Sequence, residues 1–407
     1  MSKVLYLSYD GMSDPLGQSQ VLPYLRGLRK LGHRIHLISF EKARRLEPVR
    51  AALTASVEAD GIAWHPLRYT KHPPVISAVW DLLRLRAEVR RLQREVDFDL
   101  VHCRSYLPSL LGLQMKRDSN VRFLFDMRGF WADEKVEAGT WNLRNPLYRL
   151  VYTFFKAREA EFVAEADAVV SLTHTGRREI ESWKAYERGR HRIAVIPCAA
   201  DFDLFTVAGA EQRDQARAEL GIPADSCVVA YLGSLGTWYL LGEMLDWYAV
   251  MRRRQPRSRF LFVTLDSPDL VKDQAAARGI DPTEVIVVSA SRDRIPFYLS
   301  AADLGLFFIR PSYSKQSSSP TKLGEYFAMG IPVVTNAGVG DVDETVESLG
   351  AGVIVSDFST DAYARSIEHL SGITALDPQA LRERSRTIFD LQSGVAAYHR
   401  LYQSVMD

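Results

Sequence analysis

The chain has 407 residues, of which 47% are hydrophobic and 25% are charged, and this is enough apolar material for two ordinary domains. Its 51 lysines and arginines balance 50 aspartates and glutamates, so the net charge of +1 argues against a general nucleic-acid binder. The three cysteines are widely spaced and each lies in or beside an apolar run, which argues against a disulfide scaffold. We expect Cys103, Cys198 and Cys227 to be buried and reduced.

The first residues lead directly into an expected strand, so we expect no signal peptide. The longest uncharged stretch, residues 226–242, is interrupted by Gly233 and Gly236 and is too short to span a bilayer. We therefore expect a cytoplasmic protein that is soluble or lies peripherally on a membrane.

An apolar strand at residues 4–9 is followed by a loop with Gly11 and Gly17 and then by an amphipathic helix. The two glycines are too far apart for a dinucleotide fingerprint, and a plain turn is the alternative to a ligand-binding loop. Further strands alternate with helices and are expected at residues 35–40, 63–67, 100–103, 123–125, 168–172 and 193–197. This alternation predicts a doubly wound parallel sheet, in which ligands bind beyond the carboxyl ends of the strands.

The helix expected at about residues 75–95 has a strong excess of arginine. Against Glu88 and Glu95 it carries Arg84, Arg86, Arg90, Arg91 and Arg94. A basic amphipathic helix can rest on an anionic membrane surface, so peripheral membrane contact is one interpretation. The other is a solvated charged face.

Two loops that follow strands hold the charged candidates of the first half. They are Arg104 in one loop, and Asp126, Arg128, Asp133 and Glu134 among aromatic residues in the other. Such density directly after a strand favours a site. A guanidinium stays protonated, so Arg128 stabilises charge or positions an acceptor rather than acting as a base. The carboxylates are candidates for binding acceptor hydroxyls or assisting their deprotonation, and a structural salt-bridge cluster is the alternative.

Two Asp-x-Asp pairs, at residues 97–99 and 201–203, raise the question of a divalent metal. Neither pair is joined by further nearby ligands, so we expect no metal site. The link between the domains is expected close to the second pair, before a polar helix that begins near Glu211.

The second half starts again with a strand at residues 228–232, a loop at residues 233–239 and a helix. Further strands are expected at residues 259–264, 284–288, 304–309, 333–336 and 353–355. Before the fifth strand of this half, Ser318 or Ser319 is expected to cap a helix that begins with Pro320 and ends at Gly330. Apolar residues at helical spacing then continue to the C-terminus.

The helix that begins near Pro320 predicts an anion site. A strand, a serine-rich loop and a helix place free backbone N–H groups at the mouth of a parallel sheet, where a diphosphate is favoured. Lys322 lies near the start of this helix, where a cation opposes the helix dipole at a cost of roughly 0.3–1 kcal/mol unless an anion sits in front of it. Glu325, one turn further, can accept hydroxyls from a ribose. An ordinary surface pair of lysine and glutamate is the alternative.

The run Ser-Pro-Thr-Lys-Leu-Gly-Glu-Tyr-Phe-Ala-Met-Gly-Ile-Pro-Val-Val, residues 319–334, resembles the nucleotide-sugar signature of the family-four retaining glycosyltransferases. The resemblance implies the GT-B fold, an α/β architecture of two Rossmann-like parallel-sheet domains that face a central cleft. It implies an acceptor-binding domain at residues 1–203, a donor-binding domain at residues 204–384, and a C-terminal helix, about residues 385–407, that crosses back to the first domain.

The resemblance also implies roles for single residues. In the family, a glutamate in the place of Glu325 binds the donor ribose, and a glycine in the place of Gly17 lies against the donor diphosphate. The full donor-side set that we expect is Gly17, Gly233, Ser234, Arg292, Ser319, Thr321, Lys322, Leu323 and Glu325. Arg104, Asp133 and Glu134 are expected on the acceptor side, and Arg128, Asp126 and Lys322 are the catalytic candidates.

The chain departs from the family pattern at four places. Ser317 stands where a glutamate usually touches the donor sugar, and Arg128 stands where a histidine is common. Ser234 and Tyr239 stand where relatives carry an arginine and a lysine that clamp the diphosphate. Neutralisation of that diphosphate is therefore expected from Lys322, helix dipoles, and Arg310 or Arg292.

The function expected from these features is retaining transfer of a sugar from a nucleoside-diphosphate sugar to an acceptor hydroxyl, without a cofactor or metal. A carbohydrate or lipid-linked glycan in bacterial surface-polysaccharide or glycolipid assembly is the expected acceptor. A sugar-nucleotide epimerase of similar fold and a non-catalytic sugar-nucleotide binder are the alternatives.

Overall fold

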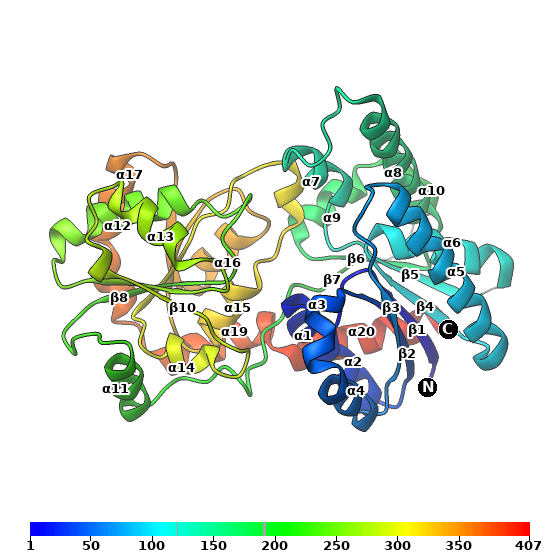
Figure 1. The fold of residues 1–407 in the computed structure, drawn as a ribbon, viewed down its shortest axis with the longest axis horizontal. Coiled ribbons are helices and arrows are strands. Elements are labelled where there is room, and N and C mark those ends of the chain that lie inside the picture. The colour runs from blue at the N-terminus through cyan, green and yellow to red at the C-terminus, as the bar shows by residue number, and fades with distance from the viewer. Residues whose placement is uncertain (120, 190–192) are drawn as a thin grey trace. The chain divides into compact units, whose positions relative to one another are not determined.

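The computed structural model describes residues 1–119, 121–189 and 193–407. Within these residues the chain forms two compact units (Figure 1). Unit 1 comprises Met1–Pro197 and Leu391–Asp407, and unit 2 comprises Cys198–Asp390. The first boundary between the units thus falls after Pro197, whereas the family resemblance implied a boundary after residue 203.

Unit 1 is built on a parallel sheet with the strand order β3-β2-β1-β4-β5-β6-β7. Its strands are β1 Lys3–Ser8, β2 Arg34–Glu41, β3 Ala63–Arg68, β4 Leu100–Arg104, β5 Arg122–Asp126, β6 Ala168–Ser171 and β7 Ile193–Val195. Strand β1 pairs with both β2 and β4, so the strand order reverses there and creates a topological switch point.

The helices of unit 1 connect these strands. They are α1 Pro15–Gln20, α2 Leu22–Lys30, α3 Ala43–Leu46, α4 Arg50–Ala59, α5 Ile76–Val96, α6 Tyr106–Ser119, α7 Trp131–Glu137, α8 Pro146–Glu165, α9 His174–Glu181, α10 Lys184–Gly189 and the C-terminal α20 Leu391–Met406.

Unit 2 repeats the plan with the parallel strand order β10-β9-β8-β11-β12-β13. Its strands are β8 Val228–Leu232, β9 Arg259–Val263, β10 Val285–Val288, β11 Leu304–Phe307, β12 Val333–Asn336 and β13 Gly352–Val355. Its helices are α11 Ala210–Glu219, α12 Leu241–Arg254, α13 Pro268–Ala276, α14 Ile295–Leu299, α15 Thr321–Ala328, α16 Val342–Leu349, α17 Thr360–Glu368, α18 Leu370–Thr374 and α19 Pro378–Phe389.

The central strands are buried along their whole length, which explains why their sequences read as continuous apolar runs. The strands β8 and β11 contain only buried residues, and so do β4 and β6. Because helices cover both faces of such a sheet, neither face needs polar side chains. The predicted pair of doubly wound parallel sheets is confirmed, with a separate hydrophobic core in each unit.

Helix α20 returns to unit 1 and packs against α2, and Figure 1 shows this red helix beside the blue start of the chain. Two glycines allow the close approach. A Cβ on Gly27 would lie 2.5 Å from the Val395 side chain, and one on Gly394 would lie 2.8 Å from the Tyr24 ring. The buried face of α20 consists of Leu391, Val395, Tyr398, Leu401, Tyr402 and Val405.

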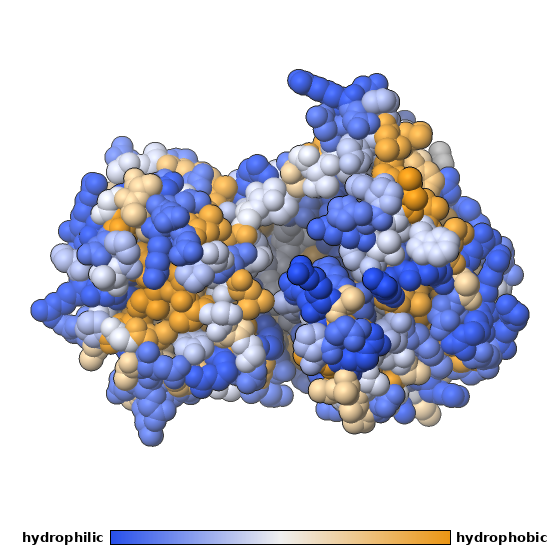
Figure 2. All heavy atoms as spheres, viewed as in Figure 1, coloured by the Kyte–Doolittle hydropathy of each residue, from blue (hydrophilic) through white to orange (hydrophobic). Residues whose placement is uncertain are grey.

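Hydrophobic side chains also reach the surface of unit 1. Figure 2 shows them in the region where Figure 1 labels α8, and this helix exposes Leu147, Leu150 and Phe154. Among the residues that the structure describes, no helix is both long and apolar enough to cross a membrane.

Candidate functional site

The predicted cap of α15 is wrong in one detail. The helix begins at Thr321, Pro320 is its N-cap, and no side chain caps it. The hydroxyl of Ser319 instead accepts a hydrogen bond from the backbone N–H of Cys198 at 3.1 Å. The first backbone N–H groups of an α-helix have no acceptor within the helix, so the amino end of α15 keeps donors for another partner.

Lys322, in the first turn of α15, is buried with only 6% of its surface exposed. Its ammonium lies 3.6 Å from the centre of the Tyr239 ring and 4.1 Å from that of Tyr231. Among the described residues, Nζ has no hydrogen-bond acceptor. Two aromatic faces are therefore the neighbours of a buried charge that would otherwise be solvated by oxygen atoms.

These surroundings destabilise the protonated form of Lys322. Burial lowers the pKa of this ammonium well below its usual range, and the negative charge of Glu325 offsets only part of that effect. Cation–π contact contributes about 0.5–2 kcal/mol, which is less than the cost of burying an ammonium without hydrogen bonds. A charged lysine here is stabilised by any anion placed at the amino end of α15.

Gly233, directly after β8, forms the backbone next to this ammonium. Its φ of +112° is a conformation that other residues rarely adopt. A Cβ at this position would lie 3.4 Å from Lys322 Nζ, so glycine also keeps space beside the cation. Ser234 is exposed, and its carbonyl accepts a hydrogen bond of 2.6 Å from the Tyr231 hydroxyl.

Glu325 and Arg292 form an ion pair through Oε1 of the glutamate. Glu325 is buried, and the guanidinium of Arg292 also lies over the Phe205 ring, 4.8 Å from its centre. The charge of Arg292 is thus already compensated by Glu325, so Arg292 is less suited than expected to neutralise an anion. Among the described residues, no side chain donates a hydrogen bond to the second carboxylate oxygen of Glu325.

Two other members of the expected donor-side set differ in exposure. Thr321 is half-buried at the first position of α15. The side chain of Leu323 belongs to the hydrophobic core of unit 2, so only its backbone could reach a ligand.

Residues of the loop after β8 matter more than the sequence suggested. The ring of Tyr239 lies next to the Lys322 ammonium. The centre of the Trp238 ring is 3.8 Å from Lys315 Nζ and 4.9 Å from the guanidinium carbon of Arg310. In the sequence, Tyr239 stood out only because relatives carry a lysine in its place. The one sequence feature that could have indicated their role is that Trp238 and Tyr239 are adjacent in a loop with glycines.

In unit 1, Asp126 ends β5 and is 1% exposed. Its Oδ2 lies 3.3 Å from His102 Nε2, 3.1 Å from the Tyr398 hydroxyl and 3.9 Å from Arg128 Nη1. Burial alone would raise the pKa of Asp126, but Arg128, His102 and Arg104 together hold it below its usual value. The group is therefore a buried carboxylate that fixes its neighbours, and it is poorly placed to take a proton from an acceptor.

His102 connects this carboxylate to the C-terminal helix. Its Nδ1 lies 2.7 Å from the Tyr402 hydroxyl. Because an ionised Asp126 can only accept, the proton of the imidazole sits on Nε2 and the Tyr402 hydroxyl donates to Nδ1. Tyr398 and Tyr402, both on α20, thus help to hold Asp126, a contribution that the sequence reasoning missed.

Arg104 is the last residue of β4 rather than part of the loop after it, and it lies opposite Asp126, the last residue of β5, in the sheet register. Arg128 follows the carboxyl end of β5. Arg104 is buried and donates from Nε to Asp10 at 3.1 Å. Arg128 has a φ of +57°, an uncommon conformation for a residue with a side chain. Such a conformation persists only where the surroundings hold it, as they often do at functional sites.

Asp133 turns away from this group of residues. Its Oδ1 accepts from the Tyr152 hydroxyl at 2.8 Å, and its Oδ2 pairs with Lys156 at 2.8 Å. Both partners belong to α8, so Asp133 ties α7 to α8. This contact corrects the expectation of an acceptor-binding carboxylate in favour of the salt-bridge alternative. Glu134 follows it in the first turn of α7 and is half-buried.

Gly17 lies inside helix α1 rather than in an open loop. It is buried, and a Cβ there would overlap the Gly11 carbonyl and lie 2.7 Å from Met12 Cα. Close backbone packing thus explains the glycine. The loop itself is held by Glu41, a residue missed in the sequence, which accepts from the backbone N–H groups of Met12 and Ser13 at 2.6 and 3.1 Å.

Within residues 1–119, 121–189 and 193–407, no three side chains of histidine, cysteine, aspartate or glutamate gather closely enough to hold a metal ion. Cys103 and Cys198 are buried, whereas Cys227 is only half-buried, and none of the three forms a disulfide.

Two family models match the chain. Glycosyltransferase Family 4 matches residues 18–204, and Glycosyl transferases group 1 matches residues 212–386. Among curated proteins, a D-inositol 3-phosphate glycosyltransferase of Salinispora arenicola is 27% identical over 305 residues, which cover 72% of this chain. The matched stretch spans 64% of that relative's length.

Solved structures show the same fold. Sucrose-phosphate synthase of Thermosynechococcus elongatus superimposes with a TM-score of 0.72 at 16% identity, covering 99% of each chain. Anabaena HepE in complex with UDP and glucose gives 0.71 at 16% identity, covering 99% of this chain and 100% of HepE. Both family models, which together span most of the chain, and the two parallel-sheet units agree, so the protein belongs to the family-four glycosyltransferases and has the GT-B fold.

Proposed function

We propose that this protein is a retaining, metal-independent glycosyltransferase that moves a sugar from a nucleoside-diphosphate sugar to an acceptor hydroxyl. The observation that carries the proposal is Lys322, a buried ammonium in the first turn of an α-helix that no side chain caps. Its Nζ lies next to the rings of Tyr239 and Tyr231 and beside Gly233, and it has no hydrogen-bond acceptor among the described residues. A diphosphate at the amino end of α15 supplies the missing acceptor atoms.

Unit 2 then supplies the electrostatic stabilisation of the leaving group. As the bond between the anomeric carbon and the phosphate oxygen breaks, negative charge grows on the diphosphate. Lys322 and the backbone N–H groups at the start of α15 are already oriented toward such a charge, so they need no reorganisation during the reaction. This replaces the arginine and lysine whose places are taken by Ser234 and Tyr239.

The acceptor oxygen forms its new bond on the face that the diphosphate leaves, which retains the configuration of the sugar. Its proton must go to a base. Arg128 cannot accept one, and Asp126 is buried and already accepts hydrogen bonds from its neighbours. We therefore assign the departing phosphate oxygen as the base, with Arg128 stabilising charge or orienting the acceptor and Asp126 holding Arg128 in place.

Glu325 is proposed to bind the ribose of the donor. Its Oε1 is engaged by Arg292, which fixes the carboxylate, and its second oxygen can accept a ribose hydroxyl. This division explains a buried glutamate that has one arginine partner. Arg292 becomes a residue that positions Glu325 rather than one that binds phosphate.

The acceptor is proposed to be a carbohydrate or lipid-linked glycan of bacterial surface-polysaccharide or glycolipid assembly. We further infer peripheral contact with the inner face of an anionic cell membrane. The arginine-rich helix α5 supports this contact, because basic side chains are attracted to anionic lipids.

A thermal-shift screen of UDP, GDP, ADP and dTDP and their sugars tests the donor site, because a bound ligand raises the melting temperature by mass action. We expect one nucleoside diphosphate to stabilise the protein and Glu325→Ala chiefly to raise KM for the donor. Arg128→Ala is expected to lower kcat instead. Wild-type kinetics in both variants would remove these assignments.

A product assay separates the alternatives. An epimerase converts the donor without any acceptor, whereas a glycosyltransferase forms a glycoside only when acceptor is present. The replacements at Ser234, Tyr239 and Ser317 favour a second candidate, a non-catalytic sugar-nucleotide binder. Tight donor binding without turnover on any soluble or lipid-linked acceptor would support that candidate.

A further inference from the structure

Helix α5 exposes two kinds of side chain along one side. Its first turns expose Ile76, Val79, Trp80 and Leu83, each more than half exposed. At 100° per residue, Arg86, Arg90 and Arg94 continue this stripe along the second half of the helix. One side of α5 is therefore apolar at its start and cationic toward its end.

The five arginines of α5 divide into two groups. Arg84 pairs with Asp81 at 2.6 Å, and Arg91 pairs with Glu88 and Glu95 at 2.6 and 2.8 Å. Arg86, Arg90 and Arg94 form no ion pair with any residue that the structure describes. Among the described residues, the one hydrogen bond that their side chains form joins Arg94 Nε to the Arg90 carbonyl, and Arg86 Nε is buried without an acceptor.

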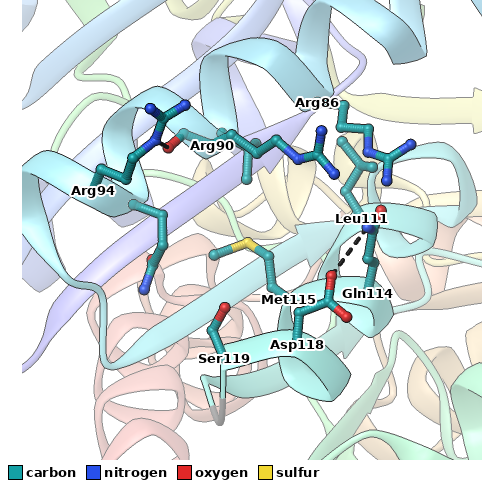
Figure 3. A pocket seen from close by; sticks show the side chains of 10 residues that line it. Arg86, Arg90, Arg94, Leu111, Gln114, Met115, Asp118 and Ser119 are labelled. Carbon is teal, nitrogen blue, oxygen red and sulfur yellow. Dashed lines mark hydrogen bonds between the residues drawn. The ribbon is translucent and has the colours of Figure 1, made fainter.

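These three arginines line a groove between α5 and α6 with a volume of about 430 Å³. Figure 3 shows them side by side along α5, opposite the side chains of α6. Val89, Leu111 and Met115 supply an apolar lining. The lining contains one carboxylate, Asp118, which already accepts from Gln114 at 3.1 Å, so the groove has an excess of positive charge.

The groove is separate from the candidate reaction site. Helix α5 ends shortly before β4 begins, and α6 ends shortly before β5 begins, so the last turns of both helices lie at the amino-terminal edge of the sheet. Arg104, Asp126 and Arg128 lie at the opposite, carboxyl-terminal edge. The groove arginines are therefore not needed to explain the chemistry of sugar transfer.

We propose that this groove binds the phosphate of an anionic phospholipid head group. Three guanidiniums with unused donors match phosphate oxygens, and the apolar lining suits the glycerol and first methylenes of a lipid. The exposed apolar stripe of the same helix, with a tryptophan, suits the interface of a bilayer. The inference rests on the proposed membrane contact and adds the chemical group that is bound there. It does not depend on the proposed glycosyl transfer.

Co-sedimentation of the full chain with vesicles tests the proposal. The vesicles consist of phosphatidylcholine alone or of an equimolar mixture with phosphatidylglycerol. We expect binding to the mixed vesicles only. Replacing Arg86, Arg90 and Arg94 by Gln is expected to weaken it about 100-fold, because each arginine near an anionic surface contributes roughly a factor of five.

Adjacent positions on the same helix provide the matched control. Arg90→Gln removes a groove charge and is expected to weaken binding about fivefold, whereas Arg91→Gln removes an equal charge that Glu88 and Glu95 already compensate and is expected to leave binding nearly unchanged. Gln114→Glu adds a carboxylate to the opposite wall without changing size, and is expected to weaken binding as Arg90→Gln does. Gln215→Glu, an exposed position of unit 2, is its control. Thermal unfolding confirms that each variant is folded.

Several outcomes would overturn the proposal. Equal losses in Arg90→Gln and Arg91→Gln would mean that only general surface charge matters. Full binding in the triple variant, with loss in Leu150→Ser, would move the contact to α8. Absence of binding to mixed vesicles, together with a melting shift by inorganic phosphate that Arg90→Gln abolishes, would make the groove a site for free phosphate instead. None of these results alters the donor assays, so failure of this inference and failure of the proposed reaction are distinguishable.

Discussion

Lys322 in unit 2 and Arg128 in unit 1 are both cations of low exposure near the carboxyl edge of a parallel sheet, yet their surroundings differ in kind. Arg128 lies 3.9 Å from the buried carboxylate of Asp126, and nearby Arg104 contacts Asp10. Lys322 has aromatic rings and a glycine around its ammonium, and no acceptor among the described residues.

This difference indicates two uses of buried charge. In unit 1 each guanidinium has a carboxylate beside it, Asp126 for Arg128 and the partly exposed Asp10 for Arg104, so both are held in place without a ligand. In unit 2 the compensation is incomplete, and an anionic ligand can supply it. The first arrangement suits orientation of an acceptor, and the second suits capture of a diphosphate.

The largest effect is expected from Asp126→Leu. This change leaves buried positive charge uncompensated and removes the acceptor for His102 and Tyr398, so the free energy of unfolding should fall by about 3–4 kcal/mol. Denaturant unfolding measures it. Asp133→Leu, which removes a partly exposed salt bridge, should cost less. Equal losses would show that Asp126 has no special role in compensating the arginines.

Lys322→Met should separate binding from stability. We expect affinity for the nucleoside diphosphate to fall by about 2.8 kcal/mol, or roughly 100-fold, because the variant lacks the cation. The melting temperature of the ligand-free protein should stay the same or rise, because a poorly solvated charge has been removed. Calorimetric titration and thermal unfolding measure the two quantities, with the exposed Lys272→Met as control. A large loss of stability with unchanged affinity would contradict the comparison.

The same lysine predicts a pH dependence. Burial lowers its pKa in the folded protein, whereas the unfolded chain titrates near 10.4, so between these values the unfolded state binds more protons. Stability contributed through Lys322 should therefore rise with pH in this window, by at most about 1.4 kcal/mol per pH unit. Comparing the unfolding of wild type and Lys322→Met from neutral to alkaline pH measures it. A difference that is constant with pH would argue against a buried charge.

The smallest effect is expected from Ser319→Ala. The hydroxyl accepts one hydrogen bond from the Cys198 backbone and does not cap α15, so its loss should cost about 1 kcal/mol of stability. Donor affinity should change little if the amino end of α15 depends on its own N–H groups and Lys322. A tenfold loss of donor affinity in this variant would place the hydroxyl in the anion site.

Much of the architecture was predictable because the information is local. Continuous apolar runs marked the buried parallel strands, such as residues 228–232. The bounds of β12, Val333–Asn336, agree with the expected strand to the residue. The positions of Lys322 and Glu325 one turn apart on a helix, behind a loop, were also visible. Periodicity and turn residues act over a few residues, so a single sequence displays them.

Contacts between distant residues could not be predicted in this way. Nothing along the chain pairs Ser319 with Cys198, Asp133 with Lys156, or Asp126 with Tyr398 on the last helix. Each polar group had several chemically suitable partners, and the choice depends on which elements the packed sheets bring together.

The type of fold, the order of its elements and the lysine and glutamate of the proposed anion site follow from patterns along the chain. Whether a charged residue is compensated or left for a ligand follows from folding, which sets Tyr239 over Lys322 and Arg292 against Glu325. The physical reason is that the cost of a buried charge depends on the atoms within a few ångströms of it, and packing brings those atoms from distant parts of the sequence.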